Sequence, residues 1–141
     1  MTISRTDPLT NSINMASATI DLITETPETG EFALMLVENG PWPENDADWN
    51  QCLSRIQSRI YDAVDVAIDG HLVAKYPDSK GRAVRVQIDS PNGLPFALAK
   101  LIAKMKAHFE TDGEYSNAIR QSPFIRGLRI TTGHEMGCFK G

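Results

Sequence analysis

The fold is decided by residues 31–70, which read EFALMLVENGPWPENDADWNQCLSRIQSRIYDAVDVAIDG. The stretch begins with six consecutive apolar residues, FALMLV, between Glu31 and Glu38. A short and continuous apolar run is typical of a strand that is covered on both faces. The run ends at Gly40-Pro41-Trp42-Pro43, where two prolines favour an extended loop over a helix. We therefore expect a central strand followed by a loop.

A long amphipathic helix should follow this loop. Its apolar residues recur at three- and four-residue steps, as expected for one face of a helix, and they are Trp49, Leu53, Ile56, Ile60, Val64, Ala67 and Ile68. Asn45 or Asp46 can cap its start, and Asp69-Gly70 can end it. We expect Trp49 to belong to the core.

Five further elements are indicated by the flanking sequence. Residues 18–24 predict a strand that pairs with 31–38 through the turn at 27–30. Residues 83–89 alternate as a half-buried strand does, and a second helix begins near Pro95. Residues 71–76 fit either a helical turn or a short strand, and residues 124–131 fit a last strand. In that strand, Arg126 and Arg129 would share a face only if Gly127 made a bulge.

Together these elements predict an α+β fold in the order ββαβα, with a possible extra C-terminal strand. We expect a small, mainly antiparallel sheet that two helices cover on one face. The length of 141 residues suits one domain. We place that domain at residues 15–132, between a flexible N-terminal lead-in at 1–14 and a flexible tail at 133–141.

The charge of the chain is unevenly distributed. Residues 1–70 contain three Lys/Arg and twelve Asp/Glu, a net −9, whereas residues 71–141 contain eleven and six, a net +5. Such a division could steer a cationic partner to one face. Alternatively, the halves interleave in the fold and neutralise each other.

A cytoplasmic location is expected. The start of the chain lacks the basic and apolar segments of a signal peptide, and no apolar stretch is long enough to span a membrane. Cys52 and Cys138 lie far apart and form no C-x-x-C pair, so we expect reduced thiols rather than a disulfide framework.

Acid–base chemistry has one candidate, His71. It could act as a base oriented by Asp69 or Asp65 beside Arg82. The simpler interpretation, which we favour, is a cation at the end of a helix. The sequence contains no zinc, calcium or phosphate-binding motif, so we expect no metal site and no cofactor.

The candidate binding surface is the acidic segment around the loop. Its members are Glu38, Trp42, Glu44, Asp46 and Asp48. Carboxylates there could contact a cationic partner, while also serving as N-terminal charge for the helix. Trp42 either anchors an interface or folds back over the apolar stripe.

One stretch carries a family resemblance. Tyr76-Pro77-Asp78-Ser79-Lys80-Gly81-Arg82, followed by a strand and preceded by the tryptophan loop and helix, resembles a family of small bacterial α+β proteins of unknown function. The resemblance covers roughly residues 18–112. It implies a ββαβα layout and supplies no catalytic residue.

These observations favour a protein-binding module of the bacterial immunity type, which neutralises a cationic toxin domain. One alternative is an enzyme with a site around His71. Another is nucleic-acid binding through the basic C-terminal half, where Lys75, Lys80, Arg82 and Arg85 flank one strand. The acidic balance of the whole chain disfavours the latter.

Overall fold

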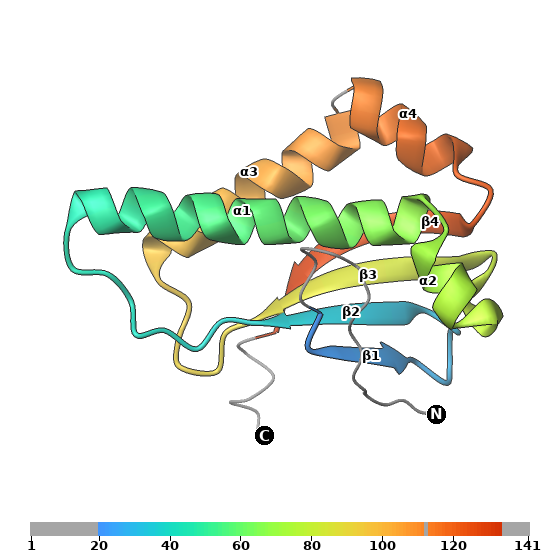
Figure 1. Ribbon diagram of the computed structural model, residues 1–141, viewed down its shortest axis with the longest axis horizontal. Coiled ribbons are helices and arrows are strands. Elements are labelled where there is room, and N and C mark those ends of the chain that lie inside the picture. Colours follow the sequence, from blue (N-terminus) through green and yellow to red (C-terminus); the bar gives the residue numbers. More distant parts are fainter. Residues whose placement is uncertain (1–19, 112, 134–141) are drawn as a thin grey trace.

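The computed structural model describes residues 20–111 and 113–133 (Figure 1). Four strands form one sheet in the order β1-β2-β3-β4. In chain order the elements are β1 (Leu22–Glu25), β2 (Phe32–Val37), α1 (Asp46–Ile68), α2 (His71–Lys75), the 3₁₀ turn η2 (Pro77–Ser79), β3 (Arg82–Asp89), α3 (Phe96–Thr111), α4 (Gly113–Gln121) and β4 (Ile125–Thr132).

The α+β class expected from the sequence is confirmed. The two expected helices are α1 and α3, and the expected C-terminal strand is β4. Asn45 is the residue that caps α1, because its side chain accepts a hydrogen bond from the Asp48 backbone N–H at 2.8 Å. Residues 71–75 form the helix α2, which is one of the two alternatives left open for 71–76, and the structure adds η2 and α4 to the expected order.

The expectation of a mainly antiparallel sheet is wrong. Only β1 and β2 pair antiparallel, whereas β2–β3 and β3–β4 are both parallel. The reason is the connections: α1 joins β2 to its neighbour β3, and α3 with α4 joins β3 to its neighbour β4. A helical crossover returns the chain to the same end of the sheet, so the next strand runs parallel.

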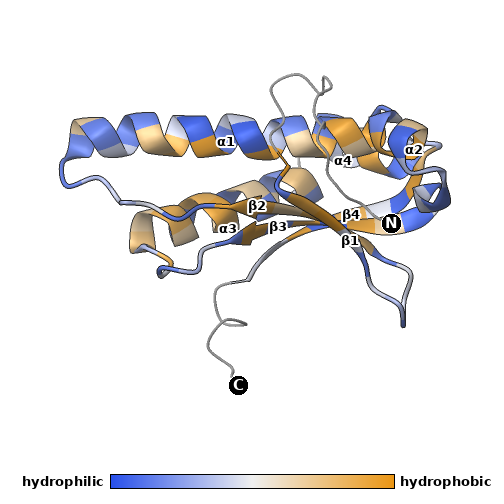
Figure 2. Ribbon diagram, turned by 60° about the horizontal axis from the view of Figure 1, so that its bottom comes forward, coloured by the Kyte–Doolittle hydropathy of each residue, from blue (hydrophilic) through white to orange (hydrophobic). Residues whose placement is uncertain are grey.

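The helices lie on one face of the sheet, as predicted. Both crossovers step across the sheet in the same direction, and right-handed crossovers of this kind leave their helices on the same side. Figure 1 shows α1, α3 and α4 together above the strands. In Figure 2, β2 and β3 are coloured hydrophobic along most of their length, while α1 alternates between hydrophobic and hydrophilic residues.

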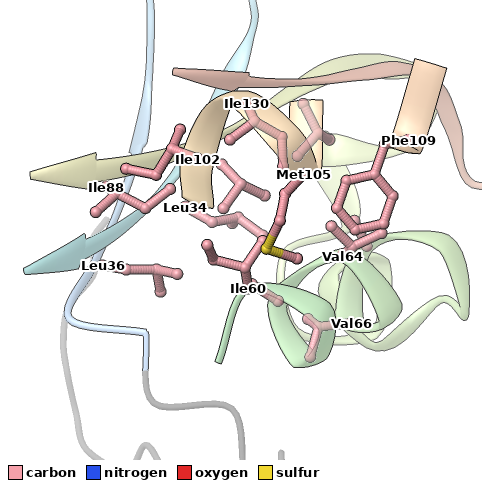
Figure 3. Packing of buried hydrophobic residues seen from close by; sticks show 14 of the residues in the cluster. Leu34, Leu36, Ile60, Val64, Val66, Ile88, Ile102, Met105, Phe109 and Ile130 are labelled. Carbon is pink, nitrogen blue, oxygen red and sulfur yellow. The ribbon is translucent and has the colours of Figure 1, made fainter. Parts of the chain in front are cut away.

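The core fills the space between the sheet and these helices. Leu34, Leu36 and Ile88 point from the strands towards Ile60 and Val64 of α1 (Figure 3). Ile102, Met105 and Phe109 of α3 and Ile130 of β4 complete the contact from the other side (Figure 3). All of these side chains are almost inaccessible to water, which makes their burial the main source of stability.

The opposite face of the sheet carries an ion cluster. Alternation along β2, β3 and β4 places Glu31, Arg85 and Arg129 away from the helices. Glu31 accepts bonds from Arg129 Nε at 2.8 Å and Nη2 at 3.0 Å, and lies 3.3 Å from Arg85 Nη1. Hydrogen bonding to Arg129, which outweighs burial, lowers the pKa of Glu31. The cluster joins three strands electrostatically.

Two details concern the end of the described chain. The pairing of β3 with β4 shifts register between Arg82 and Ala83, leaving Arg126 as an extra residue beside Gly127. Gly133, at the first position of the expected tail, is buried and donates a hydrogen bond to the Ile88 carbonyl at 3.1 Å. The remaining expected terminal segments, 1–14 and 134–141, lie outside the described residues.

Candidate interaction surface

The surface predicted from the sequence lies where the parallel strands β2 and β3 end. The loops at 38–45 and 90–95 leave these strands and lead into the starts of α1 and α3. A hydrogen bond from Asn92 Nδ2 to the Asn39 carbonyl, 2.9 Å long, ties the two loops together. The carboxyl ends of two parallel strands and the starts of the helices that follow them therefore lie at the same edge of the sheet.

Trp42 folds back onto the protein, which was one of the two alternatives left open by the sequence. It packs against the core cluster, and its ring stacks on Trp49 with centroids 6.0 Å apart and planes 6° from parallel. Its backbone N–H and ring lie 3.2–3.4 Å from where a Cβ on Gly40 would be, and Gly40 has a φ of +80°. Gly40 therefore allows the loop to turn closely against the indole.

Trp49 occupies a different position from the one expected. It is only half-buried and lies outside the core cluster, covering Trp42. The tryptophan that contacts the core thus comes from the loop, and the tryptophan at the helix start forms its outer cover. Trp42 contributes to this surface by supporting it rather than by projecting from it.

Glu38 does not belong to an exposed patch, and its expected place there is corrected. Only 5% of it is exposed. Arg55 donates to both of its carboxylate oxygens, at 2.9 and 3.1 Å, and Arg59 donates to it at 2.7 Å. Burial is the largest single influence and raises the pKa of Glu38, but the two arginines together outweigh it, so the pKa is lowered.

The Glu38 network holds β1, β2 and α1 together. Arg59 also donates to the Val37 carbonyl at 3.0 Å and to Asp21 at 2.6 Å. Asp21 in turn accepts from the Val37 N–H at 2.7 Å. Both arginines of α1 belong to this network. Their positive charge therefore does not offset the acidic residues at the start of the helix.

The remaining acidic residues of the predicted surface are exposed. Glu44, Asp46 and Asp48 all lie at the surface around the first turn of α1, and we name them the acidic patch. Within the described ranges none of the three is in an ion pair. The Asp48 carboxylate accepts a hydrogen bond from the Asn45 side-chain amide at 3.0 Å, and the Asp48 backbone N–H donates to Asn45 Oδ1 at 2.8 Å. Their charge thus faces solvent, next to the positive end of the helix dipole.

An apolar hollow lies between the starts of α1 and α3. It has a volume of about 280 Å³, and its lining residues are Leu53, Phe96, Ala97, Lys100, Leu101 and Lys104. We name it the α1–α3 groove. Phe96 is 78% exposed, and the Lys100 ammonium lies 5.5 Å from the centre of its ring. Phe96 was not among the predicted site residues. The sequence does contain a signal for its exposure, because Phe96 does not fall on the face of α3 that contains the buried residues.

The residues of the proposed His71 site do not come together. His71 is exposed at the start of α2. Asp65 accepts a hydrogen bond from Tyr115 Oη at 3.1 Å, and Arg82 donates to Glu25 at 3.0 Å and to the Gly30 carbonyl at 2.9 Å. His71 has no hydrogen bond to Asp65, Asp69 or Arg82 in the described part of the chain. The geometry of an oriented base is therefore not present.

Asp65 is hydrogen-bonded to one member of a cluster of aromatic rings. Tyr61, His108, Phe109 and Tyr115 pack with ring centroids 5.0–6.0 Å apart. Burial raises the pKa of Asp65, and the hydrogen bond from Tyr115 only partly opposes this. Burial, followed by the charge of Asp65, raises the pKa of Tyr115. The rings pack against one another at the edge of the core, where Phe109 is buried and Tyr61, His108 and Tyr115 are half-buried, so the cluster contributes to packing.

The basic half of the chain is partly neutralised by the acidic half. Arg82 pairs with Glu25, and Arg85 and Arg129 pair with Glu31. These pairs join residues from the two halves of the sequence, as the interleaving alternative expected. Lys100 and Lys104 remain on the rim of the α1–α3 groove without an acidic partner among the residues described.

Across residues 20–111 and 113–133, no three His, Cys, Asp or Glu side chains gather as a metal-ligating group. In the same ranges, none of the helices has both the length and the apolar character required to cross a bilayer.

No protein-family model, curated protein or solved structure matches this chain. The resemblance of the Tyr76–Arg82 stretch to a family of small bacterial proteins stays a prediction. What the chain does must be inferred from its own residues, and the most distinctive of these are the acidic patch and the neighbouring α1–α3 groove.

Proposed function

We propose that this chain is a protein-binding module of the bacterial immunity type, which acts in the cytoplasm and neutralises a cationic toxin domain. The observation that supports the proposal is the acidic patch. Glu44, Asp46 and Asp48 are exposed together at the first turn of α1 and have no ion-pair partner in the described ranges.

The distribution of charge along α1 strengthens the argument. Arg55 and Arg59, the two basic residues of this helix, are bonded to Glu38. Their positive charges are therefore balanced by Glu38, at the end of β2, and by Asp21. The beginning of α1 consequently presents uncompensated negative charge to solvent, which speeds the approach of a basic partner.

The rigidity of the support also favours recognition. The patch begins a 23-residue helix whose inner face is fixed in the core, and the Trp42–Trp49 stack holds the preceding loop. A charged surface held in one geometry loses little conformational entropy when a partner binds. A protein partner can bind such a surface even though the surface contains no deep pocket.

The test begins with the reading frame beside the gene of this chain. We expect that frame to encode a basic toxin domain, whose catalytically inactive form is purified and mixed with the full chain. The association rate is measured by stopped-flow fluorescence at several salt concentrations. The variant E44Q/D46N/D48N should associate roughly tenfold or more slowly at low salt, and its rate should depend less on salt.

The matched control replaces three other exposed carboxylates with amides. Glu28 lies in the β1–β2 turn, Asp78 in η2 and Glu114 in α4. The variant E28Q/D78N/E114Q has the same net charge as the patch variant. If the two variants slow association equally, the acidic patch has no special role. If the inactive toxin domain does not bind the wild-type chain at all, the proposed function is wrong.

A further inference from the structure

The α1–α3 groove has a chemistry opposite to that of the acidic patch. Its floor is formed by carbon atoms of Leu53, Ala97 and Leu101, and Phe96 stands at its edge with 78% of its surface exposed. Burying an exposed phenyl ring against a partner would remove apolar surface from water, which is favourable. A large aromatic beside an apolar hollow is typical of a protein interface.

The rim of the groove is positively charged. Lys100 and Lys104 are one helical turn apart on α3, both are exposed, and both line the hollow. Neither lysine forms an ion pair in the portion of the chain that is described. The groove should therefore bind most tightly a ligand that carries negative charge beside its apolar part.

The size of the groove indicates what can occupy it. Its volume of about 280 Å³ lies below the roughly 300–1,000 Å³ of pockets for drug-sized molecules. Such a space suits one large side chain rather than a drug-sized molecule. Because the floor is apolar and the rim cationic, that side chain should be aromatic or aliphatic, with carboxylates beside it.

We infer that the α1–α3 groove binds a second protein segment, whose apolar anchor residue is flanked by Asp or Glu. This interaction is separate from capture of a cationic toxin, because the acidic patch attracts basic groups whereas Lys100 and Lys104 attract acidic ones. The inference therefore does not depend on the proposed function. It implies that one end of the molecule offers two surfaces of opposite charge.

The inference is tested with three short synthetic peptides. Each has one central Phe, and the residues around it are acidic, serine or lysine. Binding is followed by amide chemical shifts in the ¹⁵N-labelled full-length protein. The acidic peptide should shift amides at residues 53 and 96–104 and should bind about fivefold more tightly than the lysine peptide, as expected for two exposed charge contacts.

Variants then separate the two parts of the groove. K100Q/K104Q should abolish the preference for the acidic peptide, while K106Q, which replaces an exposed lysine of α3 outside the lining, should retain it. F96S should abolish peptide binding without altering the melting temperature, because Phe96 is largely exposed.

Four results would overturn the inference. The first is equal affinity for the three peptides, and the second is a set of shifts that lies outside residues 53 and 96–104. The third is a set of amide chemical shifts that changes with protein concentration in the absence of peptide and is abolished by F96S. That result would show that a second copy of the chain occupies the groove. The fourth is binding to anionic phospholipid vesicles, dependent on Phe96 and Lys100, with no binding of peptide.

Discussion

Replacing Glu38 should destabilise the protein more than replacing any exposed carboxylate. In E38Q, the amide oxygen can accept only part of what the carboxylate accepts from Arg55 and Arg59, and the charge that balances them is lost. Removing one partner of a buried ion pair costs about 3–5 kcal/mol. The cost here is smaller, because Arg59 keeps Asp21 and the Arg55 side chain is 57% exposed.

We therefore expect E38Q to lower the free energy of unfolding by about 2 kcal/mol, most of it from Arg59, whose side chain is only 11% exposed. For a chain of 141 residues this corresponds to a decrease in melting temperature of roughly 6–10 °C. Urea unfolding and differential scanning calorimetry measure the two quantities. The control E28Q, in the exposed β1–β2 turn, should change the free energy by less than about 0.5 kcal/mol.

The two arginines provide a second comparison on the same network. R59Q should destabilise the protein more than R55Q, because Arg59 is the more buried and makes bonds to Glu38, Asp21 and the Val37 carbonyl. A stability of E38Q equal to that of the wild type, or a greater effect of R55Q than of R59Q, would refute this account of the network.

Three further predictions concern pH, backbone conformation and the Asp65 cluster. The pKa values of Glu31 and Glu38 are lowered in the folded state from an ordinary 4.5. The stabilisation that these two carboxylates supply is therefore complete above pH 4.5 and is lost as the pH falls through their lowered pKa values. The urea midpoint should consequently decrease less in E38Q than in the wild type between pH 6 and pH 3. G30A should cost about 2 kcal/mol, because Gly30 has a φ of +76° and an added Cβ would displace the Arg82 guanidinium from its hydrogen bonds to Glu25 and the Gly30 carbonyl. G81A, with a similar φ of +78° and open space around it, should cost about 1 kcal/mol in the same urea titration. D65N should raise the urea midpoint slightly at pH 7, because burial penalises the charged form of Asp65, and should lower the pKa of Tyr115 in an ultraviolet titration; an unchanged tyrosine titration would contradict the assigned contact.

Much of the fold could be predicted from local sequence patterns. The helix from Asp46 to Ile68 and the strands that became β2 and β3 follow directly from periodicity and from the prolines and glycines that bound them. The turn at residues 27–30 correctly predicts the antiparallel β1–β2 pair, but it carries no information on the direction of β3 and β4. The helical connections between neighbouring strands already implied parallel pairing.

The parts that were missed depend on contacts between distant residues. Helix α4 is a polar segment of nine residues that buries only Ser116 and Ile119, and so short a helix is marginal without the surface on which it packs. Glu38 was interpreted as an exposed acid because nothing local distinguishes it from Glu44. Its burial depends on Arg55 and Arg59, which lie 17 and 21 residues away in the chain.

The candidate surface was predicted only in part for the same reason. Glu44, Asp46 and Asp48 follow from their place at a helix start, since residues there are generally accessible. The roles of Trp42 and Trp49 depend on how the loop turns at Gly40. The α1–α3 groove exists only where two helices approach each other, so its lining could not be assembled from either helix alone.

The most direct test of the central claim, that the start of α1 is a protein-binding surface, is hydrogen–deuterium exchange of the full chain with and without the inactive toxin domain. The binding account predicts that amides protected by the toxin domain cluster at residues 42–53, next to the acidic patch, while those of α2 and α4 exchange as before. Protection confined to α2, α4 or the helix-free face of the sheet, with residues 42–53 unchanged, would contradict it.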